Sequence, residues 1–262
     1  MYHGKPTWFE LTTAHGRLTD ADAFYAGVFG WKIADAGMEG FTYHLASHGG
    51  SMVAGLMEAP QDEGSPPPSW LIYFDVDAID AAAAKVTTLG GTVVRPPEDI
   101  PGTGRFAILA DPQGAVFGLL QPEPMDPQPP VEEGAWNQNK ESHGNWVELM
   151  TSDPDAGLAF YSALLGWTKS SAVDMGEMGT YQLFRWRESD IGGMMGLGNA
   201  PVPCWLAYFG VNGVDAALER IRAGGGTIVH GPMEVPGSAF IAVAHDPQGA
   251  YFAVVGPKQH TP

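Results

Sequence analysis

Two short stretches of the chain pair a tryptophan with a glutamate, and both could carry binding or acid–base chemistry. The sequence Trp-Phe-Glu-Leu begins at Trp8, and Trp-Val-Glu-Leu begins at Trp146. Successive side chains of a β-strand point to opposite faces, so a strand places Trp8 beside Glu10 and Trp146 beside Glu148. A carboxylate among aromatic side chains loses hydration, which raises its pKa toward neutrality and suits a general base. Glu10 and Glu148 are therefore the candidate catalytic residues.

Tyrosines recur at matching places in the chain and would complete a binding surface. Tyr43 matches Tyr181, and Tyr73 matches Tyr208. The alternation pattern leaves open which way Tyr43 and Tyr181 face. Phenol and indole rings suit a flat or apolar small molecule, and a phenol can also donate a hydrogen bond. We predict that six aromatic residues contact a ligand, namely Trp8, Tyr43, Tyr73, Trp146, Tyr181 and Tyr208.

Several roles remain open for the two glutamates. They could accept hydrogen bonds from backbone or tyrosine groups and only hold parts of the fold in register. They could orient a polar or cationic ligand, or they could enolise a carbonyl substrate as a general base. A metal site shifted onto Glu10 and a neighbouring acid is a fourth alternative.

The duplication is not confined to these motifs and extends through both halves of the chain. Phe24-Tyr25 recurs as Phe160-Tyr161, and Asp-Pro-Gln-Gly occurs at Asp111 and again at Asp246. The offsets between copies stay between 135 and 138 positions, so only minor loop insertions and deletions separate them. We predict one domain over residues 6–121, with modules at about 6–60 and 68–121, and a second over 143–257, with modules at about 143–200 and 203–257. A proline-rich, acidic linker over 122–142 joins them.

Each module has the same predicted order of elements. Apolar residues spaced as on one face of a helix predict helices over 18–30, 79–89, 154–165 and 214–223, and the segments around them read as short strands. Gly30 stands where a helix C-cap belongs, and Thr19 or Asp20 could cap the start of the first helix. Asp153 followed by proline is a further predicted helix start. The resulting order is β-α-β-β-β, four times.

Together these features resemble the vicinal oxygen chelate superfamily, the group of glyoxalases, bleomycin-resistance proteins and ring-cleaving dioxygenases. The resemblance rests on the Phe-Tyr and Gly-Trp pairs after the first strand, the Gly-Gly pairs at Gly90 and Gly225, and the Asp-Pro-Gln-Gly turns. More narrowly, paired copies with Trp-x-Glu-Leu look like two-domain glyoxalase-like proteins of bacteria. The resemblance implies an α+β fold of tandem glyoxalase/bleomycin-resistance domains. In it, four βαβββ modules form cup-shaped mixed sheets with helices outside, and Trp8 and Glu10 face into a cup.

The resemblance also implies where a divalent metal would bind in metal-dependent members. Its ligands there are His, Gln or Glu on the first and last strands of a module, because an ion needs converging N or O donors. Counted from the shared landmarks, those positions fall at Trp8, Leu71, Trp146 and Leu206 on the first strands, and near Ala54, Gly118, Gly192 and Ala253 on the last strands. None of these residues has a side-chain atom that normally binds a metal. None of the eight histidines recurs in both halves at a strand-core position. We therefore expect no cofactor, a divalent metal included.

The composition narrows the partners. Thirteen basic and thirty acidic side chains give a net charge of −17, which repels phosphate backbones and anionic lipids, so we expect no nucleic acid and no membrane partner. The single cysteine, Cys204, excludes an intramolecular disulfide and fits a reducing compartment. We expect a buried structural thiol and a cytoplasmic protein. Because the duplication makes the chain a pseudo-dimer, a monomer or a homodimer is compatible with it.

Three functions compete. The first is a metal-free member of the superfamily that binds a small organic molecule. The second is a lyase or isomerase of glyoxalase type, with Glu as general base or with a non-standard metal site. The third is a protein-interaction module.

Overall fold

The computed structural model describes residues 2–61, 64–124, 129–130 and 133–259. The first half of the chain contains two β-α-β-β-β series. Their elements are β1 (Pro6–Thr13), α1 (Leu18–Phe29), β2 (Lys32–Asp35), β3 (Tyr43–His48), β4 (Ser51–Glu58), β5 (Ser69–Asp75), α2 (Ile79–Thr88), β6 (Thr92–Ile100), β7 (Gly104–Ala110) and β8 (Val116–Pro122).

The second half repeats this layout and adds a short 3-10 turn. Its elements are β9 (Gly144–Thr151), α3 (Pro154–Leu165), β10 (Thr168–Asp174), η1 (Gly176–Met178), β11 (Thr180–Trp186), β12 (Ser189–Gly196), β13 (Cys204–Gly210), α4 (Val214–Ala223), β14 (Thr227–Val235), β15 (Ala239–His245) and β16 (Tyr251–Gly256). The predicted α+β class and the four βαβββ modules are confirmed. Among the described residues, none of the helices has the length and apolar composition of a membrane-spanning segment.

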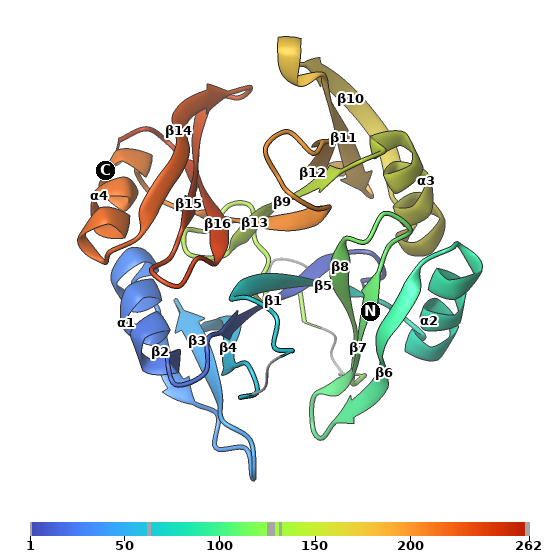
Figure 1. Cartoon of the computed structure of the whole chain (residues 1–262), viewed down its shortest axis with the longest axis horizontal. Coiled ribbons are helices and arrows are strands. Elements are labelled where there is room, and N and C mark those ends of the chain that lie inside the picture. Colours follow the sequence, from blue (N-terminus) through green and yellow to red (C-terminus); the bar gives the residue numbers. More distant parts are fainter. Residues whose placement is uncertain (1, 62–63, 125–128, 131–132, 260–262) are drawn as a thin grey trace. The chain divides into compact units, whose positions relative to one another are not determined.

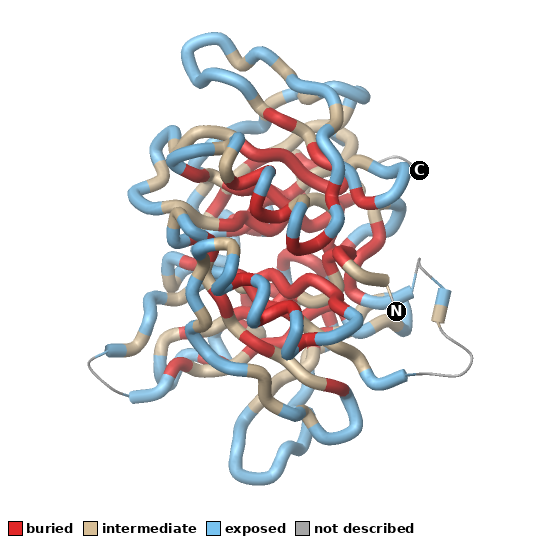
Figure 2. The backbone as a smooth tube through the Cα atoms, turned by 90° about the vertical axis from the view of Figure 1, so that its right-hand side faces the viewer, coloured by how far each residue is buried: buried red, intermediate tan, exposed pale blue. Residues whose placement is uncertain are grey.

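The strands form two mixed sheets with equivalent orders. One runs β2-β3-β4-β1-β5-β8-β7-β6, and the other runs β10-β11-β12-β9-β13-β16-β15-β14. In each module the first strand lies parallel to the last, as β1 does to β4 and β9 to β12. Buried stretches alternate with exposed loops along the chain (Figure 2).

The chain divides into two compact units, and each unit takes one module from each half. The first unit comprises Met1–Thr7, Ile72–Val131 and Trp146–Leu206, and the second comprises Trp8–Leu71, Glu132–Asn145 and Ala207–Pro262. In the first unit α2 contacts α3, and in the second α1 packs against α4 (Figure 1). The sequence left open whether modules of the two halves interleave, and within each unit they do.

A buried hydrogen-bond network ties α1 to the second half of the chain. Tyr25 Oη donates to Asp246 Oδ2 at 3.0 Å and accepts from Trp70 Nε1 at 2.9 Å. The other carboxylate oxygen of Asp246 accepts the backbone N–H groups of Gln248 and Ala250. The Asp-Pro-Gln-Gly turn of the second half therefore holds the Asp246 carboxylate in position to accept a hydrogen bond from the tyrosine of the first half.

The first unit contains the same network. Tyr161 Oη donates to Asp111 Oδ2 at 3.1 Å and accepts from Trp205 Nε1 at 2.9 Å. Burial and the charge of Asp111 raise the pKa of Tyr161 well above its usual range, so the phenol remains a donor. The recurrence of Phe-Tyr and Asp-Pro-Gln-Gly in the sequence thus has a structural cause.

The helix ends agree with the sequence except at one point. Gly30 ends α1 in the left-handed conformation, with φ of 68°, and the Asp153 side chain accepts the Ala156 N–H at the start of α3. The N-cap of α1 is Arg17, which makes no side-chain capping bond, so the predicted cap at Thr19 or Asp20 is wrong. Those two residues lie inside the first turn of the helix instead.

Part of the predicted linker is packed into the second unit. Trp136 is 6% exposed, its ring stacks on Phe9, and its backbone forms a bridge with Gly144. A side chain at Gly144 would overlap the Phe9 ring, since an added Cβ lies 2.0 Å from its Cε2 atom. Residues 125–128 and 131–132 of the linker lie outside the described part of the chain.

Candidate functional site

The first candidate site is a hydrogen-bonded relay between β1 and β3 in the second compact unit. Trp8 Nε1 donates to Tyr43 Oη at 2.9 Å, and Tyr43 Oη donates to Glu10 Oε2 at 2.8 Å. Burial, together with the charge of Glu10, raises the pKa of Tyr43, so the phenol stays protonated. The relay therefore holds the Glu10 carboxylate in place as a hydrogen-bond acceptor.

The first compact unit holds an equivalent relay between β9 and β11. Trp146 Nε1 donates to Tyr181 Oη at 2.9 Å. The pKa of Tyr181 is raised well above its usual range by burial, then by the charge of Glu148, to which Tyr181 is hydrogen-bonded. Glu148 is 9% exposed and counts among the buried polar residues. The orientation of Tyr43 and Tyr181, left open by the sequence, is toward the glutamate in both halves.

A glycine makes room for each tyrosine. Gly55 pairs with Glu10 across β1 and β4, and Gly193 pairs with Glu148 across β9 and β12. A Cβ at Gly55 would lie 1.8 Å from Tyr43 Oη, and one at Gly193 would lie 2.1 Å from the ring of Tyr181. Sequence reasoning missed these glycines, although they recur 138 positions apart, which is the offset of the Trp-x-Glu motifs.

The face of β1 that carries Glu10 is partly open. Phe9 and Leu11 are fully buried, whereas Trp8, Glu10 and Thr12 are half-buried. Residues paired across neighbouring strands share a face, so Leu45 and Met57 extend the same surface. This half-buried surface, made of Trp8, Glu10, Thr12, Tyr43, Leu45 and Met57, is called the first relay face below.

The other two predicted tyrosines lie in separate units. Tyr73, in the first unit, is 3% exposed, pairs with Gly118 and covers it so closely that a Cβ there would meet its ring at 2.2 Å. Tyr208, in the second unit, is equally buried and pairs with Ala253. Their contact with a ligand stays a prediction.

The residues at the implied metal positions do not fit a metal. Strand pairing puts Ala54 opposite Ala46 and Gly192 opposite Val147, all buried, so the neighbours that face the glutamates are Gly55 and Gly193. The expected positions near Ala54 and Gly192 thus lie one residue from the glycines that pair with the glutamates, and none of these four residues has a side-chain atom that could bind a metal. Across the described residues, no group of three or more His, Cys, Asp or Glu side chains could hold an ion.

Cys204 lies close to the second relay. It is half-buried instead of buried, and burial together with the charge of Glu148 raises the pKa of its thiol. A raised thiol pKa lowers the fraction of thiolate, which is the nucleophilic form. The matching residue of the first half, Ser69, is exposed.

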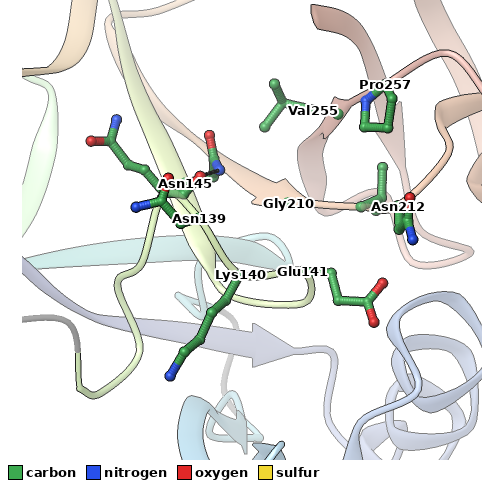
Figure 3. Close-up of a pocket in the computed structure, with 11 residues that line it drawn as sticks. Asn139, Lys140, Glu141, Asn145, Gly210, Asn212, Val255 and Pro257 are labelled. Carbon is green, nitrogen blue, oxygen red and sulfur yellow. Dashed lines mark hydrogen bonds between the residues drawn. The ribbon is translucent and has the colours of Figure 1, made fainter. Parts of the chain in front are cut away.

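A separate polar hollow of about 360 Å³ lies in the second unit, beside the ends of β13 and β16. Asn139 and Asn145 line one side and Asn212 and Pro257 the other, with the Gly210 backbone between them (Figure 3). Asn145 Nδ2 donates to the Gln138 carbonyl at 2.9 Å. The hollow contains neither relay and no aromatic side chain.

The sequence profile of the "Glyoxalase/Bleomycin resistance protein/Dioxygenase superfamily" matches residues 11–119 and again residues 144–254. The chain is 35% identical over 260 residues to "Putative glyoxylase CFP32" of Mycobacterium tuberculosis, covering 97% of this chain and 95% of that protein. It is 32% identical over 270 residues to "Anthracycline biosynthesis protein DnrV" of Streptomyces peucetius, covering 96% and 93%.

Solved structures with the same fold are more distant in sequence. A Mn(II)-bound glyoxalase from Novosphingobium aromaticivorans superposes with a TM-score of 0.67 at 17% identity, covering 100% of this chain and 85% of that one. The 2,3-dioxygenase LapB from Pseudomonas sp. KL28 superposes with a TM-score of 0.66 at 14% identity, covering 100% and 96%. At such identities the likeness extends to the fold alone.

Proposed function

Since the chain belongs to the glyoxalase/bleomycin resistance protein/dioxygenase superfamily, we propose that it is a metal-free member that binds a small organic molecule at its relays. One observation carries the proposal. In both halves Trp, Tyr and Glu form one hydrogen-bonded arrangement, and a Gly makes room for the Tyr. The positions implied for metal ligands hold no side-chain atom that normally binds a metal. Binding sites of this kind combine apolar walls with a few fixed polar groups.

The first relay face defines the chemistry of the ligand. Glu10 accepts hydrogen bonds, so it selects a ligand that donates one, such as a phenol or an amine. The indole of Trp8 and the side chains of Leu45 and Met57 offer apolar contact to a ring system. A flat ring compound with a hydroxyl group satisfies both.

The names of two relatives narrow the ligand class. DnrV of Streptomyces peucetius and DauV of a Streptomyces strain are named as anthracycline biosynthesis proteins, at 32% identity to this chain. An anthracycline contains a planar anthraquinone with phenolic hydroxyl groups, which is the chemistry that the first relay face fits. We therefore propose polycyclic aromatic ketones as the ligand class.

Thermal unfolding tests the proposal. A ligand that binds only the folded state raises the melting temperature, by an amount that grows with its affinity and its concentration. We expect quinizarin, a dihydroxyanthraquinone, to stabilise the wild type and to have less effect on a Glu10→Gln, Glu148→Gln double variant. The exposed Glu219→Gln is the matched control and should behave as the wild type. Stabilisation by a divalent metal alone would contradict the metal-free proposal.

The second candidate is a lyase or isomerase of glyoxalase type. It is supported by the name of the mycobacterial relative and by the pairing of a carboxylate base with a phenol donor. In that chemistry Glu10 would remove a proton from the carbon atom next to a carbonyl group. Tyr43 would stay protonated beside Glu10 as a hydrogen-bond donor. A glyoxalase assay with methylglyoxal and glutathione, run with chelator and with added nickel or zinc, separates the two. Turnover that survives the chelator and disappears in Glu10→Gln would favour the enzyme.

A further inference from the structure

The loop before β3 places a large apolar side chain beside the first relay. Phe41 is 44% exposed, and its ring stacks on Tyr43 with centroids 6.1 Å apart and an interplanar angle of 26°. Tyr43 in turn carries the hydroxyl that joins Trp8 to Glu10. Through its contact with Tyr43, Phe41 extends the apolar part of the first relay face, and contiguous exposed apolar surface is what marks a binding site.

The second half has no side chain at the corresponding place. Gly179 lies 138 positions after Phe41, as Tyr181 does after Tyr43. Gly179 has a φ of 81°, and a Cβ added there would have no atom within 4 Å. The second relay therefore has no side chain at this place, and no atom of the described residues lies within 4 Å of where a Cβ would stand.

Two further differences separate the relays. Glu10 is half-buried, whereas Glu148 is 9% exposed, so the first carboxylate is the more accessible acceptor. Thr12 on the first relay face is matched by Met150 in the second half. The first relay is thus more open and more polar, and it has an aromatic ring at its edge.

Building on the proposed function, we propose that Phe41 determines the specificity of the first relay for planar ligands. A flat ring system stacks on Phe41 while a hydroxyl group of the same ligand donates to Glu10. The second relay, with Gly179 in place of the ring, binds such a ligand more weakly. The duplication has then produced two unequal sites from one ancestral site.

Calorimetric titration of quinizarin into the wild type and Phe41→Ala tests the proposal. An aromatic contact of ordinary strength corresponds to about a two- to twelvefold change in affinity. We expect Phe41→Ala to weaken the tighter binding event by that factor and Phe41→Trp to preserve it. Because Phe41 is 44% exposed and stacks only at the edge of the relay, Phe41→Ala should lower the melting temperature slightly. The titration is run well below the melting temperatures of both proteins, so weaker binding cannot come from unfolding.

Met178→Ala is the matched control, since Met178 is 51% exposed on the corresponding loop of the second half. We expect this variant to leave the tighter event unchanged. If Phe41→Ala binds quinizarin as the wild type does, or Met178→Ala weakens the tighter event equally, the assignment of Phe41 is wrong while the proposed function stands. If the wild type binds no quinizarin at all, the proposed function for this ligand class fails, and the role of Phe41 fails with it.

Discussion

Replacing Tyr25 by phenylalanine removes one oxygen atom from the best-defined buried network of the second unit. Tyr25 is fully buried, and Asp246 is 1% exposed. The hydroxyl accepts from Trp70 and donates to Asp246. The variant keeps the ring packing, including the perpendicular contact with the Trp70 ring at 5.2 Å. The change is that Trp70 Nε1 and Asp246 Oδ2 both lose the Tyr25 hydroxyl as a hydrogen-bond partner inside the protein.

The size of the effect follows from those two groups. Leaving a buried donor or acceptor unsatisfied costs about 1–3 kcal/mol. Asp246 keeps the hydrogen bonds of its other oxygen to Gln248 and Ala250, so its share lies at the lower end. We expect Tyr25→Phe to lower the free energy of unfolding by roughly 2–5 kcal/mol. In a chain of this length that is a fall in melting temperature of roughly 4–20 °C.

Urea unfolding of Tyr25→Phe, followed by intrinsic fluorescence, measures this loss. Tyr161→Phe should cost a similar amount, because its bonds to Asp111 and Trp205 are equivalent. Tyr251→Phe, at a residue 52% exposed, is the control and should change stability by less than about 0.5 kcal/mol. If Tyr25→Phe lies within about 0.5 kcal/mol of the wild type, the network does not tie the modules together as described.

Two further predictions concern the first relay and a buried acid. Gly55→Ala should displace Tyr43, which lowers the free energy of unfolding by roughly 1–3 kcal/mol and weakens quinizarin binding. Gly196→Ala is the control, because a Cβ there has nothing within 4 Å, and it should change neither quantity. Burial raises the pKa of Asp75 from 3.8 to about 6, so the folded state binds its proton more tightly. The contribution of Asp75 to the free energy of unfolding therefore falls by up to ~3 kcal/mol as pH rises from about 4 to about 6. Asp75→Asn should remove this fall, and urea unfolding at several pH values measures it.

Much of the fold follows from the sequence because its signals are local or repeated. The helix ends at Gly30 and Asp153 depend on residues adjacent in the chain, and the four modules depend on a repeat that needs no three-dimensional information. The pairing of α1 with α4 does not follow, because Tyr25 and Asp246 are 221 positions apart and either motif could have served its own half.

The candidate site could be predicted only in part for a related reason. Alternation along β1 places Trp8 and Glu10 on one face, as the structure does. The orientation of Tyr43 depends on β3, whose register with β4 shifts at Ala46 and Ser47, and such an irregularity leaves no clear mark in the sequence. Phe41 was missed because it has no counterpart in the second half, where Gly179 stands at the matching position.

A crystal structure of the protein with quinizarin would show directly whether the first relay face binds the ligand. We expect the ring system to lie on the first relay face, against Trp8 and Phe41, with a hydroxyl group hydrogen-bonded to Glu10. A ligand bound instead in the hollow between Asn145 and Asn212, with the relay face empty, would contradict this expectation.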